Sequence, residues 1–159
     1  MDRLWAPWRV KYISSKKQKG CIFCKAGRKH AGDYVIFRTP QAIAMLNIFP
    51  YNNGHMLVSP VRHLSRLEDL TREEAAGLFS AVKRAKKLLE KVLKPQGFNL
   101  GVNLSRSAGA GITGHLHIHI VPRWVGDTNF MPSLAGTKII SQSLDELAKL
   151  LKNAQAKTA

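Results

Sequence analysis

Three histidines alternate with aliphatic residues in the run His115-Leu-His-Ile-His119, and this pattern constrains the fold more than any other feature of the chain. Side chains two residues apart on a β-strand point to the same face, so the run predicts a strand over His115–Val121 with the histidines on one face. The aliphatic face can pack on a core, but each imidazole needs hydrogen-bond partners for its nitrogens. Packing alone explains the run poorly, and the run therefore indicates a functional site.

Two kinds of site are compatible with the run. Three imidazoles could hold a catalytic metal with water at an open position, although neighbouring histidines on a straight strand lie about 6.6 Å apart at roughly 3.3 Å per residue. Alternatively, one imidazole attacks phosphorus and a neighbour supports the transferring phosphate. The loop Ser105–Gly114 favours the second possibility, because its glycine-rich stretch Ser107–Thr113 lets backbone N–H groups approach phosphate oxygens closely.

The rest of the chain predicts further strands and a long helix. Short segments rich in apolar or β-branched residues, separated by turn residues, predict four more strands: Tyr34–Arg38, Ala42–Asn47, His55–Ser59 and Phe98–Leu104. Thr71 and Glu74 form a capping box at the start of a helix that ends at Pro95. The apolar residues that recur at helical spacing along it are Leu78, Phe79, Val82, Leu88, Leu89 and Val92.

A second capping box, Ser143 with Glu146, opens a C-terminal helix. Strands followed by a helix, further strands and a last helix predict an α+β fold, in which helices pack on an antiparallel sheet. We therefore expect a five-stranded antiparallel sheet with one long amphipathic helix and a short C-terminal helix, as a single domain over residues 1–159.

Composition adds few constraints on function. A chain of 159 residues with 45% hydrophobic residues is ordinary for one globular domain. No apolar stretch approaches the roughly 20 residues that span a membrane, and the N-terminus, with Asp2 and Arg3, lacks the apolar core of a signal peptide. We expect a cytoplasmic protein without a membrane partner.

The net charge of +15 favours polyanions such as nucleic acid, anionic lipid or phosphorylated small molecules. Much of the excess, however, falls where solvent-exposed surface is expected. These positions are the basic loop Lys16–Lys19 and the helical residues Lys83, Arg84, Lys86, Lys87 and Lys91. Charge alone therefore selects no partner, and nucleic acid is possible but not favoured.

The only two cysteines, Cys21 and Cys24, are separated by two residues. Two cysteines cannot provide the framework of a disulfide-rich secreted protein. Two thiolates at this spacing can chelate one tetrahedral ion, which needs two further ligands. The pair is therefore a redox dithiol, half of a metal site or two free thiols.

The run His-Leu-His-Ile-His-Ile-Val resembles the signature of the histidine triad (HIT) family of nucleotide hydrolases and transferases. The stretch Gly54–Pro60 resembles the family's second strand signature. The segments Leu4–Arg9 and Pro122–Phe130 are similar to a bacterial branch close to the diadenosine tetraphosphate phosphorylases. The resemblance covers essentially the whole chain and implies cleavage of a nucleoside phosphoanhydride or related bond through a covalent nucleotidyl-histidine intermediate.

Carried over by position, the resemblance implies that His117 is the nucleophile and that His119 donates a hydrogen bond to the transferred phosphate. The other substrate-binding positions that it implies are Asn47 at the ribose, His55 beside the nucleotide, Asn103 at a phosphate, the loop amides of Gly111, Ile112 and Thr113, and Trp124 near the site.

The resemblance implies a purine nucleotide or dinucleoside polyphosphate as substrate, with water or inorganic phosphate as acceptor. Many family hydrolases have a glutamine or serine three or four residues before the first histidine of the triad, where this chain has Gly111 and Ile112. That departure favours a phosphorolytic branch, in which phosphate occupies the vacated space. Two other functions stay open: removal of adenylate from nucleic acid or amine adducts, and a nucleotide-binding module with incidental catalysis.

Some bacterial relatives complete a zinc site with a histidine after the second conserved strand and with the first histidine of the triad. By position these are His63 and His115, so the resemblance implies a closed, structural zinc site of Cys21, Cys24, His63 and His115 without an organic cofactor.

The resemblance also implies a homodimer, because members of the family are usually dimers. Trp124 and the loop that follows it are then expected near the active site. The remaining tryptophans, Trp5 and Trp8, are candidates for a core or an interface.

Overall fold

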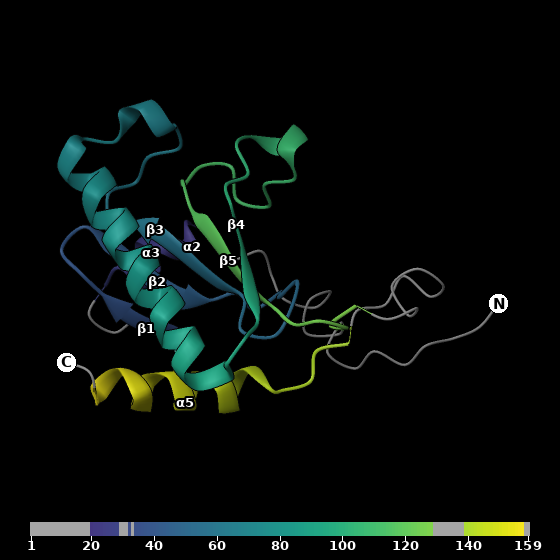
Figure 1. Ribbon diagram of the computed structural model, residues 1–159. Helices are drawn as coiled ribbons and strands as arrows, with labels where there is room; N and C mark the ends of the chain where they lie inside the picture. Colours follow the sequence, from purple (N-terminus) through teal and green to yellow (C-terminus); the bar gives the residue numbers. More distant parts are fainter. Residues whose placement is uncertain (1–19, 29–31, 33, 129–138, 158–159) are drawn as a thin grey trace.

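The computed structural model describes residues 20–28, 32, 34–128 and 139–157 (Figure 1). Trp5, Trp8, the basic loop Lys16–Lys19 and Phe130 lie outside these residues. No helix in the described part of the chain is long and apolar enough to cross a membrane.

One antiparallel sheet organises the fold, and its strands follow the spatial order β1-β2-β3-β5-β4. The strands are β1 (Val35–Arg38), β2 (Ala42–Leu46), β3 (Met56–Pro60), β4 (Gly97–Gly101) and β5 (Ile118–Arg123). β1, β2 and β3 form a meander, and β5 lies between β3 and β4. The register places His119 opposite Leu57 on one side and Gly101 on the other. The predicted five-stranded antiparallel sheet is confirmed.

The strand predicted to begin at His115 begins at Ile118 instead. The Leu116 N–H donates to the Leu64 carbonyl (2.7 Å), in the loop after β3, rather than to a neighbouring strand. β4 supplies no partner there either, because it ends at Gly101, opposite His119, and not at Leu104 as predicted. The first two histidines of the run therefore lie in the segment that leads into β5.

The long helix α3 (Arg72–Leu93) begins with the predicted capping box. The Thr71 hydroxyl accepts from the Glu74 N–H (3.1 Å), and the Glu74 carboxylate accepts from the Thr71 N–H (2.9 Å). These bonds satisfy N–H groups that have no partner within the helix. Phe79 is 63% exposed, contrary to the prediction, because it follows the buried Leu78 by about 100° around the helix.

The core lies between the sheet and two helices (Figure 1). α3 packs on β2 and β3, and the C-terminal helix α5 (Leu144–Ala156) packs beside α3 and β1. The Ser143 hydroxyl accepts from the Glu146 N–H (3.2 Å) at the start of α5, which is one of the two bonds of the predicted capping box; the described residues show no return bond from the Ser143 N–H to the Glu146 carboxylate. Ile118 and Ile120 of β5 point into this core, so alternation along the strand directs His119 to the opposite face.

The opposite face of the sheet carries α2 (Ile22–Ala26), a short helix that the sequence analysis does not predict. Ala26 packs there with Val35 and Ile43. Figure 1 shows α2 behind the sheet and α3 in front of it. Two short 3-10 helices, η1 (Leu67–Asp69) and η2 (Arg106–Ala108), lie in the loops after β3 and β4.

The turn between β2 and β3 fixes the position of His55. The His55 N–H donates to the Asn52 carbonyl (3.2 Å), and Gly54 has a φ of +75°. That φ favours glycine, and a Cβ at Gly54 would in addition displace Leu93 Cδ1 (2.4 Å) and lie 3.1 Å from Pro122 Cγ. His55 therefore enters β3 from a turn with little freedom.

Candidate active site and metal centre

Three histidines and two aromatic side chains gather on the α2 face of the sheet. Ring centroids lie 4.9 Å apart for His117 and His119, and 5.1 Å apart for His55 and His119. Phe23 of α2 packs 5.0 Å from the His117 ring. Tyr51, from the turn before β3, stacks on His119 with an interplanar angle of 7°. The fold thus brings His55 together with two members of the predicted triad.

A backbone carbonyl two residues away holds His117 in one tautomer. Its Nδ1 lies 2.8 Å from the His115 carbonyl oxygen. Because a carbonyl oxygen can only accept, Nδ1 carries the proton and Nε2 of the neutral ring keeps its lone pair. No hydrogen bond from the described residues engages Nε2. The imidazole therefore presents a nucleophilic nitrogen on the side away from His115.

His55 is held in the opposite tautomer. Its Nδ1 accepts from the Tyr51 N–H (3.0 Å) and lies 3.3 Å from the Asn47 side-chain nitrogen. The Asn47 amide is oriented by the Phe49 N–H, which donates to Asn47 Oδ1 (3.0 Å). Two N–H groups directed at Nδ1 place the proton of the neutral His55 ring on Nε2.

The tautomer of His55 determines the tautomer of His119. His55 Nε2 lies 2.9 Å from His119 Nδ1 and donates to it, so His119 carries its own proton on Nε2. That Nε2 is buried and has no hydrogen-bond partner among the described residues. A buried donor without a partner is costly unless a ligand or water accepts from it. His119 therefore carries an N–H without a partner on the ring next to His117, with ring centroids 4.9 Å apart.

Burial lowers the pKa of His55 from 6.5 to about 3 and the pKa of His119 to about 4, and the neighbouring imidazoles add to both shifts. Both rings are therefore neutral at pH 7, as the tautomer assignment requires. Histidines of the unfolded chain protonate near pH 6.5, so the unfolded state binds more protons between that pH and about pH 4. The free energy of unfolding falls as the pH is lowered across this interval.

The four residues predicted to bind zinc also meet on this side of the sheet. Cys21 Sγ lies 3.2 Å from His115 Nδ1, and Cys24 Sγ lies 3.2 Å from His63 Nδ1. All four candidate ligand atoms lie within 4.8 Å of one another. Ligands of one tetrahedral zinc lie roughly 3.3–3.8 Å apart, given bond lengths of about 2.0–2.3 Å. The cluster therefore has the composition of a structural zinc site, with donor atoms close enough to share one ion.

His115 joins this cluster to His117. Its Nε2–H donates to the Pro60 carbonyl (3.0 Å), which leaves Nδ1 free to face the thiols. Burial lowers the pKa of His115, which keeps the ring in the neutral form that a metal ligand needs. The carbonyl of the same residue accepts from His117. The His115 side chain thus faces the thiols while its carbonyl orients His117.

Among the remaining predicted substrate positions, Asn47 alone hydrogen-bonds to His55, His117 or His119 in the described part of the chain. Asn47 is half-buried and contacts His55. Asn103 follows β4 and is half-buried, and Trp124 is the half-buried residue after β5. Gly111, Ile112 and Thr113 belong to the segment that enters His115; Gly111 and Thr113 are exposed, and Ile112 is half-buried.

Two aromatic residues that contact the histidines are not predicted from the sequence. Phe23 lies between the two cysteines in the sequence, where only the thiols indicate a site. Its side chain is fully buried against His115 and His117. Tyr51 is 56% exposed and lies in a turn, but its N–H and its ring both contact His55. A glycine and two asparagines next to Tyr51 indicate only a turn.

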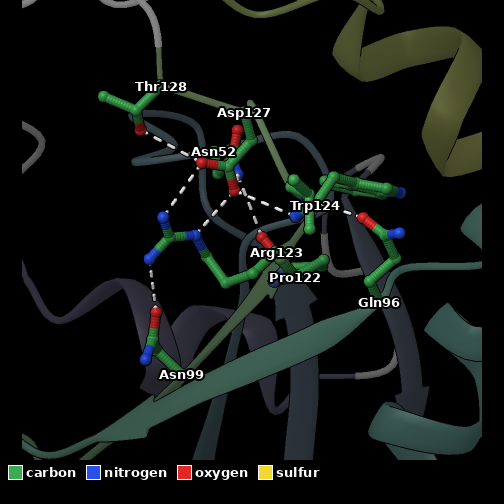
Figure 2. A network of polar contacts seen from close by, with 9 residues as sticks. Asn52, Gln96, Asn99, Pro122, Arg123, Trp124, Asp127 and Thr128 are labelled. Atoms are coloured by element: carbon green, nitrogen blue, oxygen red, sulfur yellow. Dashed lines mark hydrogen bonds and ion pairs between the residues drawn. The ribbon is translucent and has the colours of Figure 1, made fainter.

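A polar network ties this turn to the end of β5 (Figure 2). The Asp127 carboxylate accepts from Asn52 Nδ2 (2.8 Å), Arg123 Nε (2.6 Å) and the Trp124 N–H (3.1 Å). The Arg123 guanidinium above all holds the pKa of Asp127 well below its usual range. Asn52 Nδ2 also donates to the Pro122 carbonyl (3.0 Å). The turn and the Trp124 segment are therefore fixed to each other.

Fold and site together define an α+β protein with a fixed imidazole pair beside a cluster of cysteines and histidines. The family model of the HIT domain matches residues 28–125. Over 95% of its length the chain is 38% identical to the AP-4-A phosphorylase of Mycobacterium tuberculosis, of which the match covers 83%. The chain belongs to the HIT family, and the resemblance noted from the sequence is confirmed.

Solved structures agree with this assignment. A hypothetical histidine triad nucleotide-binding protein from Sulfolobus tokodaii superposes with a TM-score of 0.70 at 27% identity, covering 86% of this chain and 93% of that one. A zinc-bound histidine triad family protein from Mycobacterium smegmatis superposes with a TM-score of 0.69 at 27% identity, covering 87% and 94%.

Proposed function

We propose that this chain is an enzyme that transfers a nucleotidyl group through His117. The observation that carries the proposal is the hydrogen bond from His117 Nδ1 to the His115 carbonyl, which leaves a lone pair on Nε2. Attack on phosphorus needs a neutral nitrogen with a lone pair, held where phosphate can approach. The free N–H of His119 lies beside it and suits a phosphate oxygen.

The reaction then proceeds in two displacements. His117 Nε2 attacks the α-phosphorus, the P–N bond forms, and the bond to the leaving phosphate oxygen breaks with its electron pair. The His119 N–H donates to the oxygens that gain charge during the transfer. Water or inorganic phosphate next attacks phosphorus on the side opposite the P–N bond, which breaks with its electron pair, so that His117 leaves as a neutral imidazole. When water is the acceptor, its proton is released to solvent. Each displacement inverts the configuration at phosphorus, so the complete reaction retains it.

The substrate class that we propose is a dinucleoside polyphosphate. The support is the relative from Mycobacterium tuberculosis, which is named an AP-4-A phosphorylase and is similar along 95% of this chain. We assign phosphate as an acceptor alongside water, because Gly111 and Ile112 offer only backbone groups or aliphatic surface where many family hydrolases have a polar side chain. The residues assigned to substrate binding are Asn47, His55, Asn103, Gly111, Ile112, Thr113, His119 and Trp124.

Two alternatives have less support from the geometry. A catalytic metal held by the three histidines is disfavoured, because His115 faces the thiols while His117 donates to a carbonyl. The exposed lysines Lys83 and Lys87 do not support binding of a nucleic-acid substrate at His117, because they belong to α3, which covers the face of the sheet away from His117.

The nucleophile is tested by trapping with diadenosine tetraphosphate that carries ³²P at the α-position. Wild-type protein, quenched during turnover, should retain label that is stable to base and lost in acid, and His117→Asn should retain none. The asparagine is a matched variant, because its Nδ2 can still donate to the His115 carbonyl while Nε2 is removed. Label on His117→Asn would place the nucleophile elsewhere, and absence of label on both proteins would contradict a covalent intermediate.

We also propose that Cys21, Cys24, His63 and His115 hold one structural zinc ion. The spacing of the four donor atoms supports this, as does the zinc-bound relative from Mycobacterium smegmatis. A closed site with four protein ligands leaves no position for substrate, so zinc here would stabilise the fold and hold His115 in place.

Metal analysis of purified protein tests the zinc site. Wild type should contain about one zinc per chain, whereas Cys24→Ser should lose most of it, because three ligands bind zinc more weakly than four. Ser107→Ala, which removes a hydroxyl from an exposed loop, should keep the wild-type zinc content and serves as the control. Equal and negligible zinc in all three proteins would contradict the site.

We further propose a homodimer in which β4 contributes to the interface. Within the described residues β4 pairs only with β5, and Leu100, Val102 and Leu104 on or after it are exposed. An unpaired edge with exposed apolar side chains is suited to pairing with a second chain. Light scattering should give twice 17.7 kDa for wild type and a lower mass for Leu100→Lys. A monomeric wild type would contradict the proposal.

A further inference from the structure

The carboxylate of Asp127 lies outside the triad but is connected to it through the turn Tyr51–His55. We propose that Asp127 is a positioning residue that sets the tautomer of His119 by holding this turn. The inference rests on the proposed role of His119 as a hydrogen-bond donor to phosphate. It assigns a function to a network that joins segments 75 residues apart in the sequence.

The first connection runs from Asp127 to Asn52. Asn52 is buried, and its Nδ2 donates to Asp127 Oδ2 (2.8 Å) and to the Pro122 carbonyl (3.0 Å), so both hydrogens of that amide are used. Figure 2 shows these bonds converging on the segment after β5. Arg123 Nε (2.6 Å) and Nη2 (2.9 Å) bind the two oxygens of Asp127 and fix the orientation of the carboxylate. Asn52 is therefore held by a rigid acceptor.

The second connection runs through the turn itself. The Asn52 carbonyl accepts from the His55 N–H, and the adjacent residue, Tyr51, donates its own N–H to His55 Nδ1 (3.0 Å). The Tyr51 ring lies against His55 and His119 with centroid distances of 4.6 and 5.7 Å. Because Tyr51 precedes Asn52 directly in the same turn, holding Asn52 restricts the positions that the Tyr51 N–H can take.

The third connection is the pair of imidazoles, which has two possible proton arrangements. With the Tyr51 N–H in place, His55 donates from Nε2 and His119 presents N–H at its free Nε2. Without that donor, the Asn47 amide, at 3.3 Å, is the one remaining group directed at His55 Nδ1. His55 can then hold its proton on Nδ1 and accept from His119 Nδ1, which leaves a lone pair on His119 Nε2. A lone pair facing phosphate oxygens repels them, whereas an N–H stabilises them. The position of the turn thus decides what His119 offers to substrate.

Nitrogen-15 NMR of the histidine rings tests the inference without substrate. In wild type, His55 and His119 should each show a proton on Nε2 and an unprotonated, hydrogen-bonded Nδ1. In Asp127→Ala and in Asn52→Ala, both rings should show mixed tautomers. The value of kcat should fall in proportion to the fraction of protein that loses the His119 Nε2–H, about tenfold where nine-tenths of the rings carry the reverse tautomer, while KM changes less than about threefold.

Asn99→Ala is the matched control. Asn99 Oδ1 accepts from Arg123 Nη1 (2.7 Å) in the same network, but it does not contact Asn52. This variant should keep the wild-type tautomers and a kcat within about twofold of wild type, a smaller effect than removal of a positioned donor.

Three results would overturn the inference. They are a proton on Nδ1 of His119 in the wild type, unchanged tautomers in the folded Asp127→Ala and Asn52→Ala variants, and loss of tertiary structure in both variants, which would assign Asp127 to folding alone. The inference fails separately from the proposed function, since trapping on His117 reports the nucleophile and the ring spectra report the protons of His55 and His119.

Discussion

The hydrogen bond from His117 Nδ1 to the His115 carbonyl is the interaction on which the proposed chemistry depends. A carbonyl oxygen has no proton to give, so this bond keeps the His117 proton on Nδ1. The reverse tautomer would direct a lone pair at a buried acceptor, at a cost of about 1–3 kcal/mol. That cost corresponds to a population ratio of about five- to 150-fold. A contact between residues two apart therefore selects the reactive form of the ring.

Backbone groups of two residues fix His117 and His55 in opposite tautomers. An acceptor, the His115 carbonyl, faces His117, and a donor, the Tyr51 N–H, faces His55. Because His55 donates in turn to His119, the site combines one bare nitrogen with one free N–H. The cluster of Cys21, Cys24 and His63 contacts the His115 ring, so a metal bound there would hold the carbonyl that orients His117.

The sequence predicts the local elements of this fold and only part of its site. The capping box at Thr71 and the alternation at His117 and His119 are short-range patterns, and both are confirmed. α2 is not predicted, because five residues are too few to show a helical period. The start of β5 is predicted too early, because strand pairing, not side-chain alternation, decides where a ladder begins. The contact between Asp127 and Asn52 depends on tertiary structure and has no local signal.

The stereochemical course of the reaction tests the central claim most directly. Diadenosine tetraphosphate with a chiral phosphorothioate at the α-phosphorus, cleaved with isotopically labelled water or phosphate as acceptor, reports whether one or two displacements take place. Attack by His117 followed by attack of the acceptor predicts overall retention of configuration. Overall inversion would show that the acceptor attacks phosphorus directly and would contradict a covalent intermediate on His117.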